Sequence, residues 1–151
     1  MKTTKQELYI VGIEVRTTNE NGQAAKDIPA LWNRFMQEEI ADRIPNKTDA
    51  TIYALYTDYE SDHTRPYTAI LGCHVNSLDN IPEDFTVKIV PESNYEQFVA
   101  KGDLTQNAVI DVWMEIWNSD LPRAYTTDLE IYGDKAVNPT DGEATILIAV
   151  K

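Results

Sequence analysis

The chain has 151 residues, 42% of them apolar, which is enough to bury the core of one domain. Its 25 acidic and 13 basic residues give a formal net charge of −12, so its surface repels phosphate backbones and anionic membranes. No apolar run approaches the roughly 20 residues of a spanning helix, and no secretory leader is visible. We therefore expect a cytoplasmic protein that contacts neither membranes nor nucleic acid directly, and whose single cysteine, Cys73, forms no internal disulfide.

The first half of the chain predicts one strand, one helix and a hairpin. Residues 8–15 mix apolar and β-branched positions and lead into a polar run with an Asn-Gly turn signal. Apolar residues recur at helical spacing over 28–44, with Asp27 as the expected N-cap and Pro29 in the first turn. The hairpin strands are expected at 51–59 and 67–75.

The second half repeats this order. A strand is expected at 85–90, a further extended stretch at 95–99, a helix over 105–118, and a hairpin from 127–132 and 144–150. Strand positions align at a single offset of 76 residues, whereas the helices align at 81. The aligned pairs are Val11 with Val87, Leu55 with Ile131, Ile70 with Ile146, and Trp32 with Trp113.

This recurrence predicts an α+β fold of two fused β-α-β-β units related by a pseudo-twofold axis. The whole chain, 1–151, is then one domain, with internal repeats at about 1–76 and 84–151 joined by a polar connector. Because each unit has one helix for about three strands, we expect an antiparallel sheet with both helices on one face and a ligand cleft between the halves. The alternative is that two amphipathic hairpins align by chance.

The expected hairpins differ at one position. Strand alternation places Glu130 on the same face as Tyr132, and the equivalent residue of the first half is Ala54. Glu130 then has two interpretations: an exposed glutamate on the outer face, or a carboxylate in an aromatic groove that complements a cation.

Other site chemistries find little support. His63 is expected in a polar turn and His74 beside Cys73 in a strand, which gives no metal-ligand pair. Cys73 fits a buried core thiol better than a nucleophile. The sequence contains neither a Gly-x-Ser-x-Gly elbow nor a Gly-rich phosphate loop. We expect no metal and no cofactor.

Five segments occur in an order that resembles a known family. They are 28–35 (IPALWNRF), 67–73 (YTAILGC), 81–83 (IPE), 112–117 (VWMEIW) and 129–132 (LEIY). In that order they resemble the GyrI-like or AraC-type effector-binding domains, the ligand-sensing modules of multidrug-responsive transcription regulators. The similarity covers residues 8–151 and is greatest to the stand-alone branch of integron-associated effector-binding proteins.

The resemblance implies a protein that binds hydrophobic, often cationic compounds in an aromatic cleft. The family pattern around its cation-facing glutamate assigns that role to Glu130, with Tyr132 beside it, and places Trp113 and Trp117 near the cleft. Tyr56 is expected to contact the ligand as well, and Trp32 to pack in the core of the first half. Full-length regulators add a helix-turn-helix domain, for which these 151 residues leave no room, so direct gene regulation is not expected.

Two other functions stay open at this stage. Some GyrI-like proteins resemble hydrolases that open strained electrophilic rings, and Glu130 could serve as a base in such a reaction. The acidic surface could instead inhibit a partner protein, although charge explains solubility equally well. Because only one clear cleft carboxylate is visible, we favour binding over catalysis.

Overall fold

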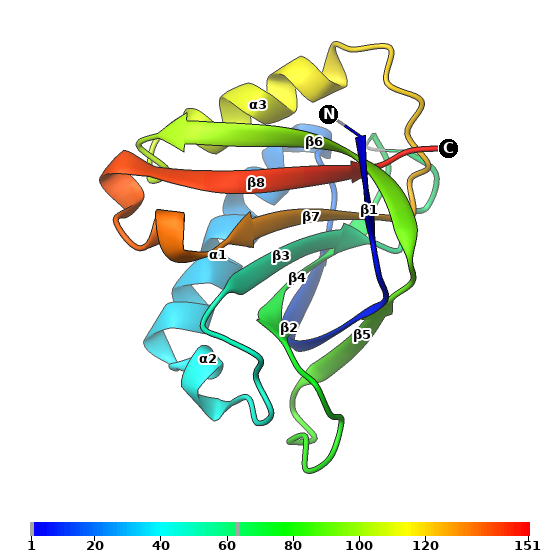
Figure 1. Ribbon diagram of the computed structural model, residues 1–151. Helices are drawn as coiled ribbons and strands as arrows, with labels where there is room; N and C mark the ends of the chain where they lie inside the picture. The colour runs from blue at the N-terminus through cyan, green and yellow to red at the C-terminus, as the bar shows by residue number, and fades with distance from the viewer. Residues whose placement is uncertain (1, 63) are drawn as a thin grey trace.

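The computed structural model describes residues 2–62 and 64–151 and has one antiparallel sheet as its framework (Figure 1). In the described residues the sheet has eight strands in the order β1-β6-β8-β7-β3-β4-β2-β5, and it curls into a half-barrel. The strands are β1 (Lys2–Lys5), β2 (Leu8–Thr17), β3 (Ile52–Thr57), β4 (Tyr67–His74), β5 (Thr86–Val90), β6 (Ser93–Gly102), β7 (Thr127–Tyr132) and β8 (Gly142–Ala149). The sequence patterns did not predict β1, a short polar strand.

The helices cover one face of this sheet, as expected. They are α1 (Ala24–Gln37), the short α2 (Ile40–Arg43) and α3 (Ala108–Trp117). Leu31 and Phe35 of α1 and Trp113 and Ile116 of α3 join one core cluster with residues of the sheet. In Figure 1, α1 lies behind the strands. A second cluster, which includes Leu129, fills the other face. None of the described helices combines the length and apolar character needed to cross a membrane.

The strand order has the expected pseudo-twofold arrangement. The units β2-α1-β3-β4 and β6-α3-β7-β8 form the two sides of the sheet, and β3 pairs with β7 at its centre. The remaining two strands are exchanged, because β1 pairs with β6 of the other unit and β5 pairs with β2. The α+β class with helices on one face is therefore confirmed, and its central β3–β7 pair lies beneath the helices.

The predicted alignment of the first strands is wrong. Val11 and Val87 are not equivalent positions, because they lie opposite each other as partners in neighbouring strands. The counterpart of β2 is β6, and the two strands begin at Leu8 and Ser93, an offset of 85 residues. The apolar and β-branched pattern of β2 is found both in β5, its hydrogen-bonded neighbour, and in β6, its counterpart in the second unit. Periodicity alone could therefore not show which of the two strands is the counterpart.

The hairpins also differ by one residue from the common offset. Leu55 and Ile131, which are 76 residues apart, both pack in or against the second core cluster, so β3 and β7 keep the predicted offset. Ile70 faces the second cluster, whereas Ile146 faces the helices. Because side chains alternate along a strand, these two residues cannot be equivalent, and their predicted alignment is wrong by one position.

The first helix differs from its expected bounds. It begins at Ala24 rather than after Asp27, which places Pro29 in the second turn. Residues with good helix propensity precede Asp27, and Asp27 accepts a hydrogen bond from Gln23 Nε2 at 3.0 Å. Glu39 adopts a left-handed conformation (φ 51°), which ends the regular helix and separates α2 from α1.

Candidate functional site

Glu130 lies at the centre of the sheet, on the face that the helices cover. Its register partners are Ala54 on β3 and Ile146 on β8, both buried and apolar. Only 3% of the Glu130 residue surface is exposed, so the outer-face interpretation is wrong for this structure. The small side chain of Ala54, directly opposite, leaves space for the carboxylate beside it.

Three neutral donors surround the Glu130 carboxylate. The hydroxyl of Tyr132, two residues along β7, donates to Oε1 at 2.5 Å. The Tyr56 hydroxyl from β3 and the Trp113 Nε1–H from α3 donate to Oε2, at 2.9 and 2.7 Å. The structure therefore brings together four of the five predicted site residues through direct hydrogen bonds to Glu130.

Burial dominates the protonation equilibrium of this cluster. It raises the pKa of Glu130, although the three hydrogen bonds act in the opposite direction. Burial, and then the negative charge of Glu130, raise the pKa values of Tyr56 and Tyr132 well above the ordinary tyrosine value. Both hydroxyls therefore stay protonated and act as donors at neutral pH.

Further aromatic rings extend this cluster towards solvent. The rings of Trp113 and Trp117, one turn apart on α3, have centroids 6.1 Å apart, and Trp117 is half-buried whereas Trp113 is buried. Trp32 of α1 meets Tyr132 edge-on at 5.1 Å. The predicted place of Trp32 in the core of the first half is confirmed, since its half-buried ring packs against the core cluster. The ring also contacts Tyr132, which donates a hydrogen bond to the Glu130 carboxylate. Helical spacing could not show that α1 reaches across to β7.

A second buried carboxylate, Asp128, lies two residues before Glu130 on the same face of β7. Its Oδ2 pairs with Arg123 Nη2 at 2.8 Å and accepts the Tyr59 hydroxyl at 2.5 Å, while Oδ1 accepts the backbone N–H of Ala149 at 2.8 Å. Burial raises the pKa of Asp128, and Arg123 and the hydrogen bonds lower it.

The sequence patterns did not predict a role for this pair. One signal was present: Arg123 is the only basic residue between Lys101 and Lys135, and it precedes a strand whose inward face carries two acids.

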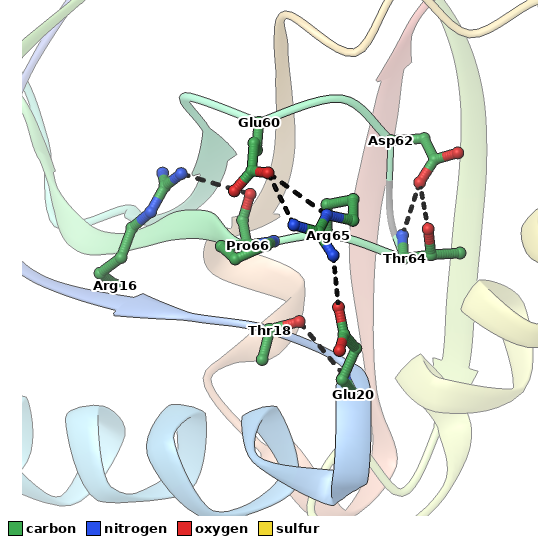
Figure 2. Close-up of polar contacts among 8 residues, drawn as sticks. All are labelled: Arg16, Thr18, Glu20, Glu60, Asp62, Thr64, Arg65 and Pro66. Atoms are coloured by element: carbon green, nitrogen blue, oxygen red, sulfur yellow. Dashed lines mark hydrogen bonds and ion pairs between the residues drawn. The ribbon is translucent and has the colours of Figure 1, made fainter.

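The connection between β3 and β4 holds Tyr59 in this position. Figure 2 shows Arg65 donating to Glu60 Oε1 at 2.9 Å and pairing with Glu20 at 3.6 Å, across to the segment after β2. Arg16 donates to the carbonyl of Pro66 at 3.3 Å. These contacts tie the connection to β2. His63 lies outside the described residues.

Cys73 and His74 lie in β4, whereas the three donors to the Glu130 carboxylate lie in β3, α3 and β7. Cys73 is buried in β4, as expected, and burial raises the pKa of its thiol to about 11. His74 is half-buried, with Nδ1 3.3 Å from Thr48 Oγ1. Among the described residues, no three His, Cys, Asp or Glu side chains gather as a metal site would need.

Comparisons with known proteins agree with this architecture. The transcriptional regulator-like protein YobU of Bacillus subtilis is 28% identical in an alignment of 144 residues that covers 93% of this chain and 90% of YobU. An integron cassette protein from the mobile metagenome of Vibrio cholerae is 32% identical, with a TM-score of 0.76 and coverage of 100% of this chain and 95% of the other.

A further solved structure shares the fold. SAV2435, solved bound to tetraphenylphosphonium, superposes with a TM-score of 0.82 at 22% identity, over 100% of this chain and 93% of SAV2435. Finally, the family model for the integron-associated effector binding protein (Cass2) matches residues 3–150. The chain therefore belongs to the integron-associated effector binding protein family.

Proposed function

We propose that this protein binds lipophilic cations among the aromatic rings around Glu130. The observation that carries the proposal is a buried carboxylate whose hydrogen-bond partners are all neutral. Within the described part of the chain, the ion pairs found do not include Glu130. An ionised carboxylate is costly in such surroundings without a counter-charge, so a bound cation gains an interaction that the empty protein lacks.

The surrounding rings suit the apolar part of such a ligand. The faces of Trp and Tyr attract cations, and their large apolar areas favour flat or bulky aromatic groups. Trp32, Trp117 and Tyr132 are half-buried and border the buried group formed by Glu130, Tyr56 and Trp113. In this structure the rings pack against one another, so a bulky ligand must displace the partly exposed ones to reach the carboxylate.

The complex of SAV2435 with tetraphenylphosphonium supports the ligand class. That cation has no hydrogen-bond donor, so a protein can recognise it only through its charge and its aromatic surface. The cluster around Glu130 offers both. Because SAV2435 is only 22% identical to this chain, the similarity supports the proposal through the fold alone. The support for a cation at Glu130 comes from the side chains of this chain.

Two ligands of the same shape and opposite charge test the proposal. Calorimetric titration should show tetraphenylphosphonium binding to the native protein and tetraphenylborate binding much more weakly. Glu130→Gln should weaken tetraphenylphosphonium by roughly 1 to 3 kcal/mol, the range of a charge-assisted contact, without weakening tetraphenylborate. Glu115→Gln on the exposed side of α3 is the matched control. Equal affinity of native protein and Glu130→Gln for the cation would contradict the proposal.

Tryptophan emission can locate the ligand. An aromatic cation stacked on an indole should quench its fluorescence, and Trp113→Phe and Trp117→Phe should each reduce that quench. Trp113→Phe also removes one donor from Glu130 and should have the larger effect on affinity. A ligand-induced quench that survives unchanged in both variants places the ligand elsewhere.

A further inference from the structure

Arg123 carries hydrogen-bonding groups that the fold does not use. Its side chain is only 4% exposed, and Nη2 accounts for its contacts with Asp128 at 2.8 Å and with the Tyr59 hydroxyl oxygen at 3.5 Å. The Nε and Nη1 nitrogens are also buried, and within the described residues they have no hydrogen-bond partner. Buried donors are nearly always paired, and an unpaired one is costly, so such donors on a charged group indicate a binding function.

Aromatic rings hold this guanidinium in place. Its central carbon lies 4.4 Å from the ring centroid of Tyr125, 5.9 Å from that of Trp113 and 6.0 Å from that of Tyr59. Tyr125 has a left-handed backbone (φ 54°), an uncommon conformation for a bulky residue that persists only where its surroundings enforce it. The rings and the Asp128 ion pair restrict the side chain, so its two free nitrogens keep a defined position.

The guanidinium of Arg123 shares a neighbour, Trp113, with the site around Glu130. Trp113 connects the two groups, because the same indole contacts the guanidinium and donates its Nε1–H to Glu130 at 2.7 Å. Asp128 and Glu130 are two residues apart on one strand face, a spacing of roughly 7 Å along the backbone. A ligand whose charge lies at Glu130 could therefore reach Arg123 with a short arm.

The local charges select the kind of acceptor. Asp128 already neutralises Arg123, and Glu130 is a second acidic group nearby, so a carboxylate on the ligand would meet two like charges. We propose that the Nε–H and Nη1–H groups of Arg123 bind a neutral oxygen acceptor, such as a ketone or amide carbonyl, on the same lipophilic cation that Glu130 recognises. This inference rests on the proposed function and narrows it to cations with a carbonyl-type oxygen a short distance from the charged centre.

Two phosphonium ions of matched length test this assignment. We compare (4-oxopentyl)triphenylphosphonium, which carries a ketone, with pentyltriphenylphosphonium, which does not, by calorimetric titration. The native protein should bind the ketone about tenfold more tightly, the effect of one hydrogen bond to a charged donor. Arg123→Lys keeps a cation for Asp128 but loses the planar fork of donors, so the ratio of the two Kd values should fall towards one. Arg34→Lys, on the exposed side of α1, should preserve the ratio.

The outcomes separate this inference from the proposed function. If both phosphonium ions bind the native protein equally and Glu130→Gln weakens both, the cation site stands and the Arg123 assignment is wrong. If neither binds, the proposed function fails together with the inference. Tighter binding of (4-carboxybutyl)triphenylphosphonium than of the ketone would replace the neutral acceptor with an anion.

A second measurement does not depend on the stability of a variant. In nitrogen-15 spectra of the native protein, the Nε–H signal of Arg123 should shift with the ketone ligand and move much less with the pentyl ligand. Equal shifts with both ligands would show that Arg123 does not form a hydrogen bond with the ketone oxygen.

Discussion

Asp128 and Glu130 share one face of β7 and are almost equally buried, with 0% and 3% of their surfaces exposed, but their surroundings differ. Asp128 has a cation from its own chain, Arg123, at 2.8 Å. Glu130 has Tyr56, Tyr132 and Trp113, none of which carries a positive charge. The fold therefore completes one carboxylate site and leaves the charge of the other unmatched.

This difference separates a carboxylate with a structural role, Asp128, from a carboxylate with a binding role, Glu130. A buried carboxylate that is paired and hydrogen-bonded is satisfied in the folded protein, and the loss of its partner is costly. A buried carboxylate with only neutral donors is best satisfied when a cation arrives from solution. Both sites use Trp113, which contacts the guanidinium of Arg123 and donates to Glu130, so the completed site also positions the incomplete one.

The comparison predicts its largest effect at Asp128. Asp128→Asn leaves Arg123 buried without its counter-charge and should lower the free energy of unfolding by about 3 to 5 kcal/mol. Glu130→Gln should change it by no more than about 1 kcal/mol at pH 7, because Glu130 forms no ion pair with the residues that the structure describes. Urea denaturation of both variants measures the contrast. An equal or larger loss for Glu130→Gln would remove the distinction between the two sites.

A second, smaller effect is expected at Ala54, the register partner of Glu130. Ala54→Leu adds bulk beside the carboxylate and should lower stability by about 1 to 3 kcal/mol through overpacking, while also weakening tetraphenylphosphonium. Ala100→Leu, equally buried on β6, should cost similar stability and leave binding intact. A loss of binding in both variants would mean that general destabilisation is responsible.

The third prediction concerns the pH dependence of stability. Because the folded pKa of Glu130 is raised above the unfolded value of about 4.5, the folded state binds more protons in this range. The native protein should therefore lose stability relative to Glu130→Gln as pH rises from 4.5 through the raised pKa, and the difference should then level off. Urea melts of both proteins across pH 4 to 8 measure this difference. A difference that stays constant would mean that burial does not perturb Glu130.

Local sequence patterns predicted much of the fold. Apolar and β-branched runs predicted seven of the eight described strands, because these strands contribute apolar side chains to the core clusters, and helical spacing predicted both long helices, because each packs one face against the sheet. The missed strand, β1, buries no large apolar side chain and exists through its pairing with β6. The wrong equivalence of Val11 and Val87 has a related cause. The strand β5 pairs with β2 of the other unit, and the spacing of apolar residues along a strand does not show with which unit that strand pairs.

The sequence identified Glu130 as a candidate site residue but not the contacts of Trp32 and Arg123 around it, for similar reasons. Ala54 and Glu130 face each other because β3 and β7 pair at the pseudo-twofold axis, so a comparison of the repeats could identify the carboxylate. Trp32 and Arg123 could not be placed in this way. Their roles depend on how α1 and the segment before β7 pack against that strand, and the spacing of residues within an element contains no such information.

The smallest predicted effect is the release of a proton when a cation binds. Burial raises the pKa of Glu130 in the empty protein, and a cation nearby favours the charged form and lowers that pKa. Between the two pKa values, binding must therefore release a proton, and at higher pH it must not, because the group is already ionised. Calorimetric titration of tetraphenylphosphonium across pH 4 to 8, in buffers of different ionisation enthalpy, should show release of less than one proton per ligand where Glu130 is partly protonated, and none at the alkaline end. Affinity should rise with pH over the same range, and Glu130→Gln should abolish both effects. Proton uptake in place of release would show that the carboxylate is not the group that meets the cation, and the contrast with Asp128 would then lose its functional meaning.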